Sequence, residues 1–266
     1  MNKLWMASMA IPFVAACQSN PTLSPQEITA QCNTVVKGET VDPGVACFHN
    51  ESSLHTAVQF GDSVSKGYSI PARHDLCGVV DYRHDNWDRE NINLCGKSYN
   101  GYHAGLVINQ GNNNGYSTTL LEAMETHLNG KHFNLVLFNS GYHDVQHNSG
   151  AHVTRVSEYD YRNNLEAISQ VCEQSADICI WVDTPTLDAD ELPLGSQVVS
   201  NSDVLRYNAI AHSIAREHGF YILSVGGKNH DGSVHFTGYG YDVIGKAIAQ
   251  CVLIALQQGR SDSCHR

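Results

Sequence analysis

A serine and a histidine that lie far apart in the sequence could act together as a nucleophile and its base. Ser63 follows the strand-like run 56–60 within Gly61-Asp62-Ser63, and His235 directly precedes an amphipathic segment near the end of the chain. A serine hydroxyl is a weak nucleophile, so it needs an imidazole that accepts its proton. Because a serine between a strand and a helix lies at the carboxyl edge of a parallel sheet, Ser63 is a candidate for acyl transfer.

Two more polar segments follow strand-like runs and can supply hydrogen-bond donors. Gly111 lies in the segment 108–115, and His143 lies in the segment 138–144. Together with the two segments around the serine and the histidine, they are expected to converge on one rim of the sheet. Backbone amides and an imidazole N–H at such a rim can stabilise the negative charge of a tetrahedral intermediate.

These four segments resemble the conserved blocks of the SGNH (GDSL-type) hydrolases, and the matching blocks extend over most of residues 55–257. The resemblance implies a serine esterase with Ser63 as nucleophile and His235 as base. It also implies an oxyanion hole formed by the amides of Ser63 and Gly111 and by the side chain of His143. The family usually has Gly-x-Asn-Asp in its third block, where this chain has Gly-Tyr-His-Asp; some branches carry Gly-x-His-Asp.

The fourth block departs further from the family pattern. The family places an aspartate three residues before the histidine, but Gly232 occupies that position here and Asp231 lies four residues before His235. Our hypothesis is that Asp231 accepts the Nδ1 proton of His235, which leaves Nε2 free to take the proton of Ser63.

Two other classes of function stay open. The sequence offers candidate metal ligands in His143, Asp144 and His147 and in His230, Asp231 and His235. Such spacings are compatible with a metallohydrolase. An SGNH-like module that binds a glycan without turnover is the second alternative, because the aspartate is displaced. We expect an enzyme without metal or cofactor, because the serine, glycine and histidine of the family blocks are all present.

The amino terminus predicts export and lipidation. Residues 1–16 have one lysine and a short apolar stretch, as in a signal peptide, and they are followed by Cys17. Val-Ala-Ala-Cys resembles the lipobox of bacterial lipoproteins, which implies an acylated Cys17 and a membrane anchor, and Gln18 resembles lipoproteins sorted to the outer membrane. The net charge of -11 and the lack of a basic run argue against nucleic acid as a partner.

The cysteines support an oxidising cell-envelope compartment. Eight of them remain after Cys17: Cys32, Cys47, Cys77, Cys95, Cys172, Cys179, Cys251 and Cys264. An even number in an exported protein suggests disulfides. Their order favours neighbouring pairs, 32–47, 77–95, 172–179 and 251–264, because each closes a short loop.

The length and the alternation of segments predict one α/β domain. A chain of 266 residues supports a single domain, at 54–266, after a polar tether and cystine-closed lead-in at 17–53. Strand-like runs at 56–61, 105–109, 133–139, 178–183 and 220–225 alternate with helix-like segments at 117–129, 158–173, 202–218 and 239–257. This alternation predicts a three-layer α/β/α, flavodoxin-like fold with a mostly parallel central sheet.

The substrate is the least determined part of the prediction. Residues 75–104 show no strong period and are expected to form a long loop, closed by Cys77 and Cys95, over the site. Its polar and aromatic composition and the expected envelope location favour O-acetyl esters of carbohydrates. A lipase or phospholipase of the same family is the alternative.

Overall fold

A six-stranded sheet forms the middle layer of the computed structural model, which describes residues 54–76, 79–85, 93–96, 105–107, 114–151 and 153–266. Its strands, in spatial order, are β10 (Cys264–His265), β9 (Tyr221–Leu223), β6 (Ala176–Val182), β5 (Phe133–Phe138), β1 (His55–Phe60) and β2 (Val80–His84). All neighbouring pairs are parallel except β10 and β9. The mostly parallel sheet that the sequence predicts is confirmed.

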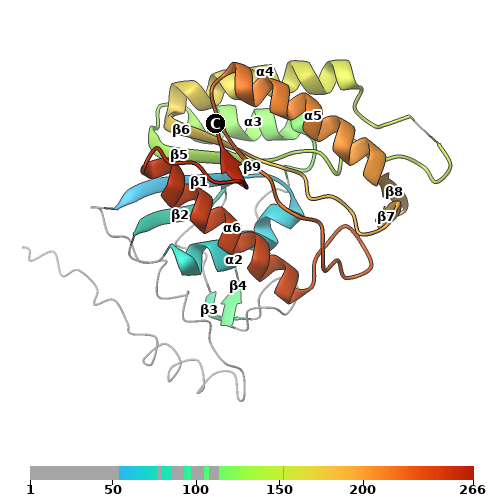
Figure 1. Ribbon diagram of the computed structural model, residues 1–266, viewed down its shortest axis with the longest axis horizontal. Coiled ribbons are helices and arrows are strands. Elements are labelled where there is room, and N and C mark those ends of the chain that lie inside the picture. The colour runs from blue at the N-terminus through green and yellow to red at the C-terminus, as the bar shows by residue number, and fades with distance from the viewer. Residues whose placement is uncertain (1–53, 77–78, 86–92, 97–104, 108–113, 152) are drawn as a thin grey trace, which may run out of the picture.

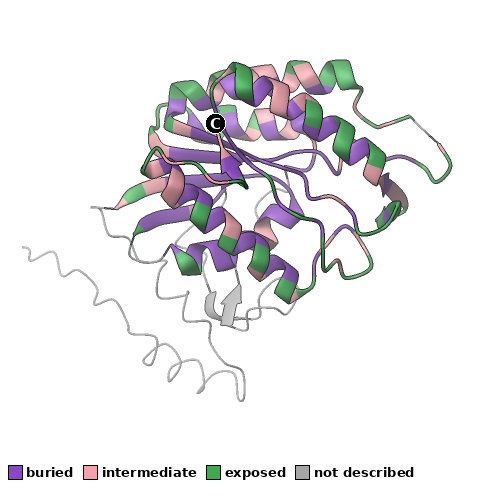
Figure 2. Ribbon diagram, viewed as in Figure 1, coloured by how far each residue is buried: buried purple, intermediate pink, exposed green. Residues whose placement is uncertain are grey.

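Helices cover both faces of this sheet (Figure 1). On one face α2 (Ser63–Asp75) packs against α6 (Gly238–Leu256), and on the other α4 (Glu158–Ser175) lies between α3 (Ser117–Leu128) and α5 (Asn201–Glu217). The strands between the two helical layers are almost entirely buried (Figure 2). By length and composition α6 could span a membrane, but half of that stretch is buried, as expected of a core helix.

The helices begin and end at residues that satisfy their terminal backbone groups. The side chains of Asp62, Ser157, Ser200 and Thr237 accept hydrogen bonds from amides in the first turns of α2, α4, α5 and α6. These caps replace bonds that the first amides of a helix cannot make within it. Gly219 follows α5 with φ of +67°, a conformation that favours glycine and turns the chain into β9.

Two parts of the sheet differ from the sequence-based expectation. The run at 105–109 forms β4 (Gly105–Val107), which pairs with β3 (Asn93–Gly96) in a separate two-stranded sheet. The edge strand of the central sheet is β2, within the region that was expected to be a loop. Its pattern was obscured by Asp81, which is buried and bonded to Arg73 of α2 at 2.9 Å and to Arg83 at 2.5 Å.

Two of the expected disulfides are present. Cys172–Cys179 joins the end of α4 to β6, and Cys251–Cys264 joins α6 to β10. The other two predicted pairs, 32–47 and 77–95, lie outside the residues whose side chains are described, as do the predicted signal peptide, Cys17 and the tether.

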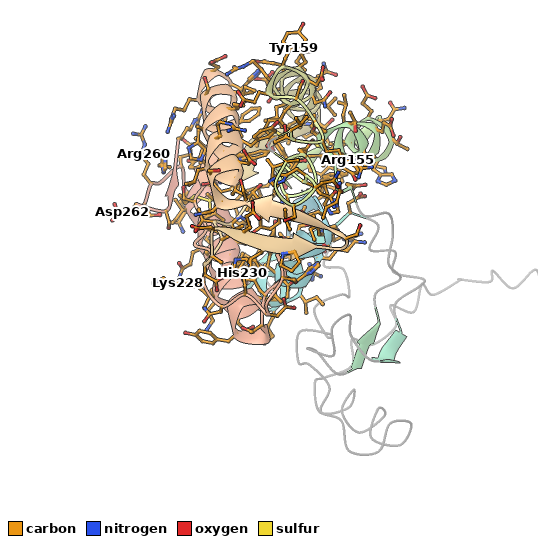
Figure 3. All side chains as sticks on the ribbon, turned by 90° about the vertical axis from the view of Figure 1, so that its right-hand side faces the viewer. Arg155, Tyr159, Lys228, His230, Arg260 and Asp262 are labelled. Carbon is orange, nitrogen blue, oxygen red and sulfur yellow. A yellow bond between two sulfur atoms is a disulfide. The ribbon has the colours of Figure 1, made fainter. Side chains whose placement is uncertain are left out.

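The strand order determines where a ligand can bind. Taken along the chain, β1, β2, β5, β6 and β9 have the order 2-1-3-4-5 of flavodoxin-like sheets. The order reverses between β1 and β5, and crevices at this switch point, beyond the carboxyl ends of the strands, are the usual ligand sites of such folds. Ser63 follows β1 at this point, and Gly141 and His143 follow β5. A second two-stranded sheet, β7 (Glu191–Leu194) with β8 (Gln197–Ser200), lies at the same edge (Figure 3).

Candidate active site

Ser63 and His235 meet at the carboxyl edge of the sheet. Ser63 is the first residue of α2, and its Oγ lies 2.8 Å from Nε2 of His235. The two residues are 172 positions apart in the chain. Ser63 retains 8% of its surface exposed and His235 is half-buried, so solvent and a small ligand can reach the pair. The structure therefore brings together the two residues that the sequence suggested as nucleophile and base.

The residues just before Ser63 hold it against the end of β5. Asp62 accepts hydrogen bonds from the amides of Val64 at 3.0 Å and Ser65 at 3.2 Å. Its side chain thus binds the second and third amides of the helix, and not the Ser63 amide that we expect in the oxyanion hole. A Cβ on Gly61 would lie 2.0 Å from Oδ1 of Asn139, so only glycine allows this close approach.

A tight loop presents His235. His230 and Phe236 form an antiparallel bridge, and the amide of Asp231 donates to the carbonyl oxygen of His235 at 3.0 Å. Among the described residues, the hydrogen-bond partner of His235 Nδ1 is the hydroxyl of Ser233, at 3.2 Å. The Asp231 carboxylate accepts from that same hydroxyl at 2.7 Å. Asp231 therefore reaches the imidazole through Ser233, a residue that the sequence reasoning did not single out.

The ring of His143 packs against the backbone of Gly115, the last residue of the polar segment 108–115. A Cβ on Gly115 would come within 2.9 Å of the His143 ring, and the ring of Tyr116 meets it edge-on with centroids 5.4 Å apart. The exposed guanidinium of Arg155 lies over the Tyr116 ring, 4.7 Å from its centroid. Gly111, the other expected donor to the oxyanion hole, lies outside the described residues.

The environment of His143 favours its neutral form. Burial lowers the pKa of His143, the carboxylate of Asp62 opposes this shift, and the charged forms of His235 and Arg155 lower the pKa further. A neutral imidazole donates from one nitrogen only. His143 can thus serve as a single uncharged N–H donor close to Asp62 and His235.

Asp144 has a structural position next to these residues. Its carboxylate accepts from the Ser117 amide at 3.0 Å, the Ser117 hydroxyl at 2.7 Å and the Ser140 hydroxyl at 2.6 Å, and so connects the start of α3 to the end of β5. Burial raises the pKa of Asp144 to about 6, and these hydrogen bonds limit the rise.

A second serine–histidine pair lies two residues beyond Ser63 in α2. Ser65 Oγ is 2.7 Å from Nε2 of His84, the last residue of β2, and Nδ1 of His84 is 2.8 Å from the carbonyl oxygen of Asp85. Both side chains are fully buried, and burial lowers the pKa of His84 to about 4. No sequence motif marked His84, because its strand was not recognised.

The candidate metal ligands do not converge. Asp144 binds two serines, His147 Nδ1 lies 3.0 Å from the carbonyl oxygen of Asn148, and His230 Nε2 lies 3.2 Å from that of Thr186. Over the described part of the chain, no three His, Cys, Asp or Glu side chains are grouped as a metal site requires.

Comparison with solved structures identifies the fold. A GDSL-like lipase from Bacteroides thetaiotaomicron is 16% identical, with 80% of this chain and 94% of that chain covered and a TM-score of 0.53. An acetyl xylan esterase is 14% identical, with 74% of this chain and 99% of that chain covered and a TM-score of 0.53. An acetyl-xylooligosaccharide esterase from Geobacillus, in a mutant form, is also 14% identical, with 80% and 100% covered and a TM-score of 0.53. No protein-family model and no curated protein sequence matches the chain. Its α/β fold with a mostly parallel central sheet matches the structures of SGNH hydrolases.

Proposed function

We propose that this protein is a serine esterase that hydrolyses acyl esters, with Ser63 as nucleophile and His235 as general base. The observation that carries the proposal is the 2.8 Å contact between Ser63 Oγ and His235 Nε2 at the switch point of the sheet. The proposal is also supported by the shared fold, since several proteins with it are named as esterases.

The reaction follows from the groups at this edge. His235 Nε2 takes the hydroxyl proton as Ser63 Oγ attacks the ester carbonyl, and it then protonates the leaving alkoxide. The N–H groups of Ser63, Gly111 and His143 are the proposed donors to the tetrahedral oxyanion. A water molecule, deprotonated by His235, then attacks the acyl-enzyme, and His235 returns that proton to Ser63 Oγ as the acid is released.

The substrate we propose is an O-acetylated carbohydrate. Two of the structures with the same fold are named as esterases of acetylated xylan and xylooligosaccharides. The same fold also occurs in a protein named as a GDSL-like lipase, so a lipid ester is the alternative substrate. The predicted lipid anchor at Cys17 would hold the enzyme at the outer membrane of a bacterial envelope, and a glycan ester there is a fitting substrate.

The first test is the hydrolysis of p-nitrophenyl acetate with and without Ser63. Ser63→Ala is expected to lower kcat at least 10³-fold, the scale of losing the nucleophile. Ser213→Ala on α5 is the matched control, and it should keep full activity because its hydroxyl bonds to the exposed Glu217, away from the carboxyl edge of the sheet. The wild type is assayed with and without a chelator, and the variants with it. Turnover that survives Ser63→Ala, or that disappears with chelator in the wild type, would contradict the serine mechanism.

The second test separates carbohydrate from lipid substrates. The proposal predicts a higher kcat/KM for p-nitrophenyl acetate than for the octanoate, and release of acetate from acetylated xylooligosaccharides that Ser63→Ala abolishes. A preference for the octanoate together with no acetate release would favour the lipase alternative while leaving the serine mechanism intact.

A further inference from the structure

We propose that Ser233 is the positioning residue of this active site: its hydroxyl fixes the tautomer of His235 and connects the imidazole to the Asp231 carboxylate. The inference rests on the proposed esterase function and adds to it a residue that the family pattern does not supply. Ser233 lies two positions before His235, between the displaced aspartate and the base.

Counting hydrogen bonds around Ser233 Oγ gives each contact a direction. A serine hydroxyl has one hydrogen to donate and two lone pairs to accept. The hydrogen goes to Oδ1 of Asp231 at 2.7 Å, because a carboxylate only accepts. The backbone amide of His235 donates to Oγ at 3.1 Å and uses one lone pair. The 3.2 Å contact with His235 Nδ1 uses the second lone pair, so Nδ1 must carry the proton.

This assignment prepares the imidazole for catalysis. With the proton on Nδ1, a neutral His235 has its lone pair on Nε2, which faces Ser63 Oγ at 2.8 Å. The serine can then donate its proton only to Nε2. When His235 becomes an imidazolium during the reaction, Nδ1 keeps its proton, and the hydroxyl dipole of Ser233, oriented by Asp231, stabilises the positive charge.

The backbone explains why the aspartate acts through a serine here. Gly232 occupies the usual aspartate position with φ of +97°, a conformation that side-chain-bearing residues rarely adopt. The turn is closed by the bond from the Ser233 amide to Asp231 Oδ1 at 3.1 Å and by that from the Asp231 amide to the His235 carbonyl oxygen. The loop thus holds Asp231 and His235 on either side of the Ser233 hydroxyl.

The position of Asp231 sets the size of its effect. Asp231 is exposed to solvent, whereas Ser233 is half-buried. The field of an exposed carboxylate is screened by water and salt. The structure therefore assigns the larger role to the Ser233 hydroxyl and a smaller, salt-dependent one to Asp231, the reverse of a direct aspartate–histidine pair.

A double-mutant cycle on p-nitrophenyl acetate hydrolysis tests this inference. We expect Ser233→Ala to lower kcat roughly 10²-fold and to move the acid limb of the kcat/KM profile, and Asp231→Asn to lower kcat less than about tenfold. The double variant should resemble Ser233→Ala, because Asp231 acts through that hydroxyl. Ser233→Thr should restore most of the loss. His143 also interacts electrostatically with His235. Because it is the same in all of these variants, it does not contribute to the differences between them.

Controls separate positioning from folding. Ser157→Ala removes a comparable serine–aspartate bond, 2.6 Å to Asp160 at the start of α4, and should leave kcat and the pH profile unchanged. A loss in Asp231→Asn that equals or exceeds that in Ser233→Ala, or additive losses in the double variant, would overturn the inference in favour of a direct role for Asp231. An unmoved acid limb in Ser233→Ala would reduce Ser233 to a structural residue.

A readout that does not depend on activity distinguishes this inference from the proposed function. Ring-nitrogen NMR at neutral pH, with His235 assigned by comparison with His235→Gln, should show Nδ1–H in the wild type and a mixture of tautomers in Ser233→Ala. If the tautomer behaves so but no ester is hydrolysed, the proposed function fails and the role of Ser233 stands. If turnover depends on Ser63 and the tautomer is indifferent to Ser233, the reverse holds.

Discussion

Two serine–histidine pairs lie side by side on the first turn of α2, and only one of them is suited to catalysis. Ser63–His235 and Ser65–His84 have nearly the same Oγ–Nε2 distance, 2.8 and 2.7 Å. In the second pair, Nδ1 donates to the carbonyl oxygen of Asp85, so a neutral His84 also presents its Nε2 lone pair to the serine. The hydroxyl of Ser65, however, also has the carbonyl oxygen of Asp62 as an acceptor at 2.7 Å, which competes with His84 for its single hydrogen.

What differs is the environment of the imidazole. His235 is half-buried, and its Nδ1 faces a hydroxyl backed by a carboxylate. His84 is fully buried, its Nδ1 faces an uncharged carbonyl, and burial lowers its pKa to about 4. A histidine with such a pKa cannot hold a proton at neutral pH. We infer that a short contact with the serine is not enough, and that the base must also be open to solvent and able to carry a proton.

The same substitution in both histidines gives the largest expected contrast. His235→Gln should lower kcat for p-nitrophenyl acetate at least 10³-fold and change the free energy of unfolding little, because it removes the base from a half-buried position. His84→Gln should keep kcat within about tenfold of wild type but lose roughly 1–3 kcal/mol of stability at neutral pH, because it disturbs buried hydrogen bonds. The measurements are steady-state kinetics and urea unfolding on the same preparations.

The predictions for His235→Gln and His84→Gln can be contradicted independently. A loss of turnover in His84→Gln as large as that in His235→Gln, with stability retained, would show that the buried pair takes part in the reaction. Normal turnover in His235→Gln would remove the Ser63–His235 pair from the mechanism.

His143 is a third histidine at this edge, and its expected role gives an intermediate effect. As an uncharged donor to the oxyanion it should tolerate replacement by an amide, which also donates an N–H. We expect His143→Ala to lower kcat roughly 10²-fold, the scale of losing one oxyanion-hole donor, and His143→Asn to lower it far less. Equal losses in the two variants, measured as kcat on p-nitrophenyl acetate, would argue that His143 supports the Gly115 backbone and donates no hydrogen bond.

Regular amphipathic segments were predictable from the sequence, and strands with buried charges were not. The four helices for which limits were predicted, α3 to α6, end within about two residues of them because their apolar stripes and capping residues are local signals. The strand β2 was missed because its alternation includes Asp81 and Arg83, which look solvent-exposed in the sequence. The charge of Asp81 is compensated by its neighbour Arg83 and by Arg73, which comes from a different element, and no local pattern reports that second contact.

The candidate site shows the same limit. The serine, glycine and histidine blocks were found because each lies next to a strand or helix that periodicity reveals, and the structure brings Ser63 and His235 together. The position of Ser233 between Asp231 and His235 depends on the turn at Gly232, with its φ of +97°. The Asp-Gly-Ser sequence before the histidine was the available signal, since Asp-Gly favours tight turns that bring neighbouring side chains together.

The buried pair should also be visible in the pH dependence of stability, which is the smallest of the expected effects. The pKa of His84 falls from an ordinary 6.5 to about 4 on folding, so the unfolded chain binds more protons in this interval and stability is lost as the pH falls through it. Asp144, whose pKa rises to about 6 on folding, acts in the opposite direction below pH 6 and masks part of the loss. The difference in unfolding free energy between wild type and His84→Gln cancels the Asp144 contribution. It should shrink by about 2 kcal/mol from pH 7.5 to pH 5, measured by urea unfolding. A difference that stays constant over this range would show that His84 can be protonated in the folded protein, and the contrast between the two pairs would then rest on exposure of the serine alone.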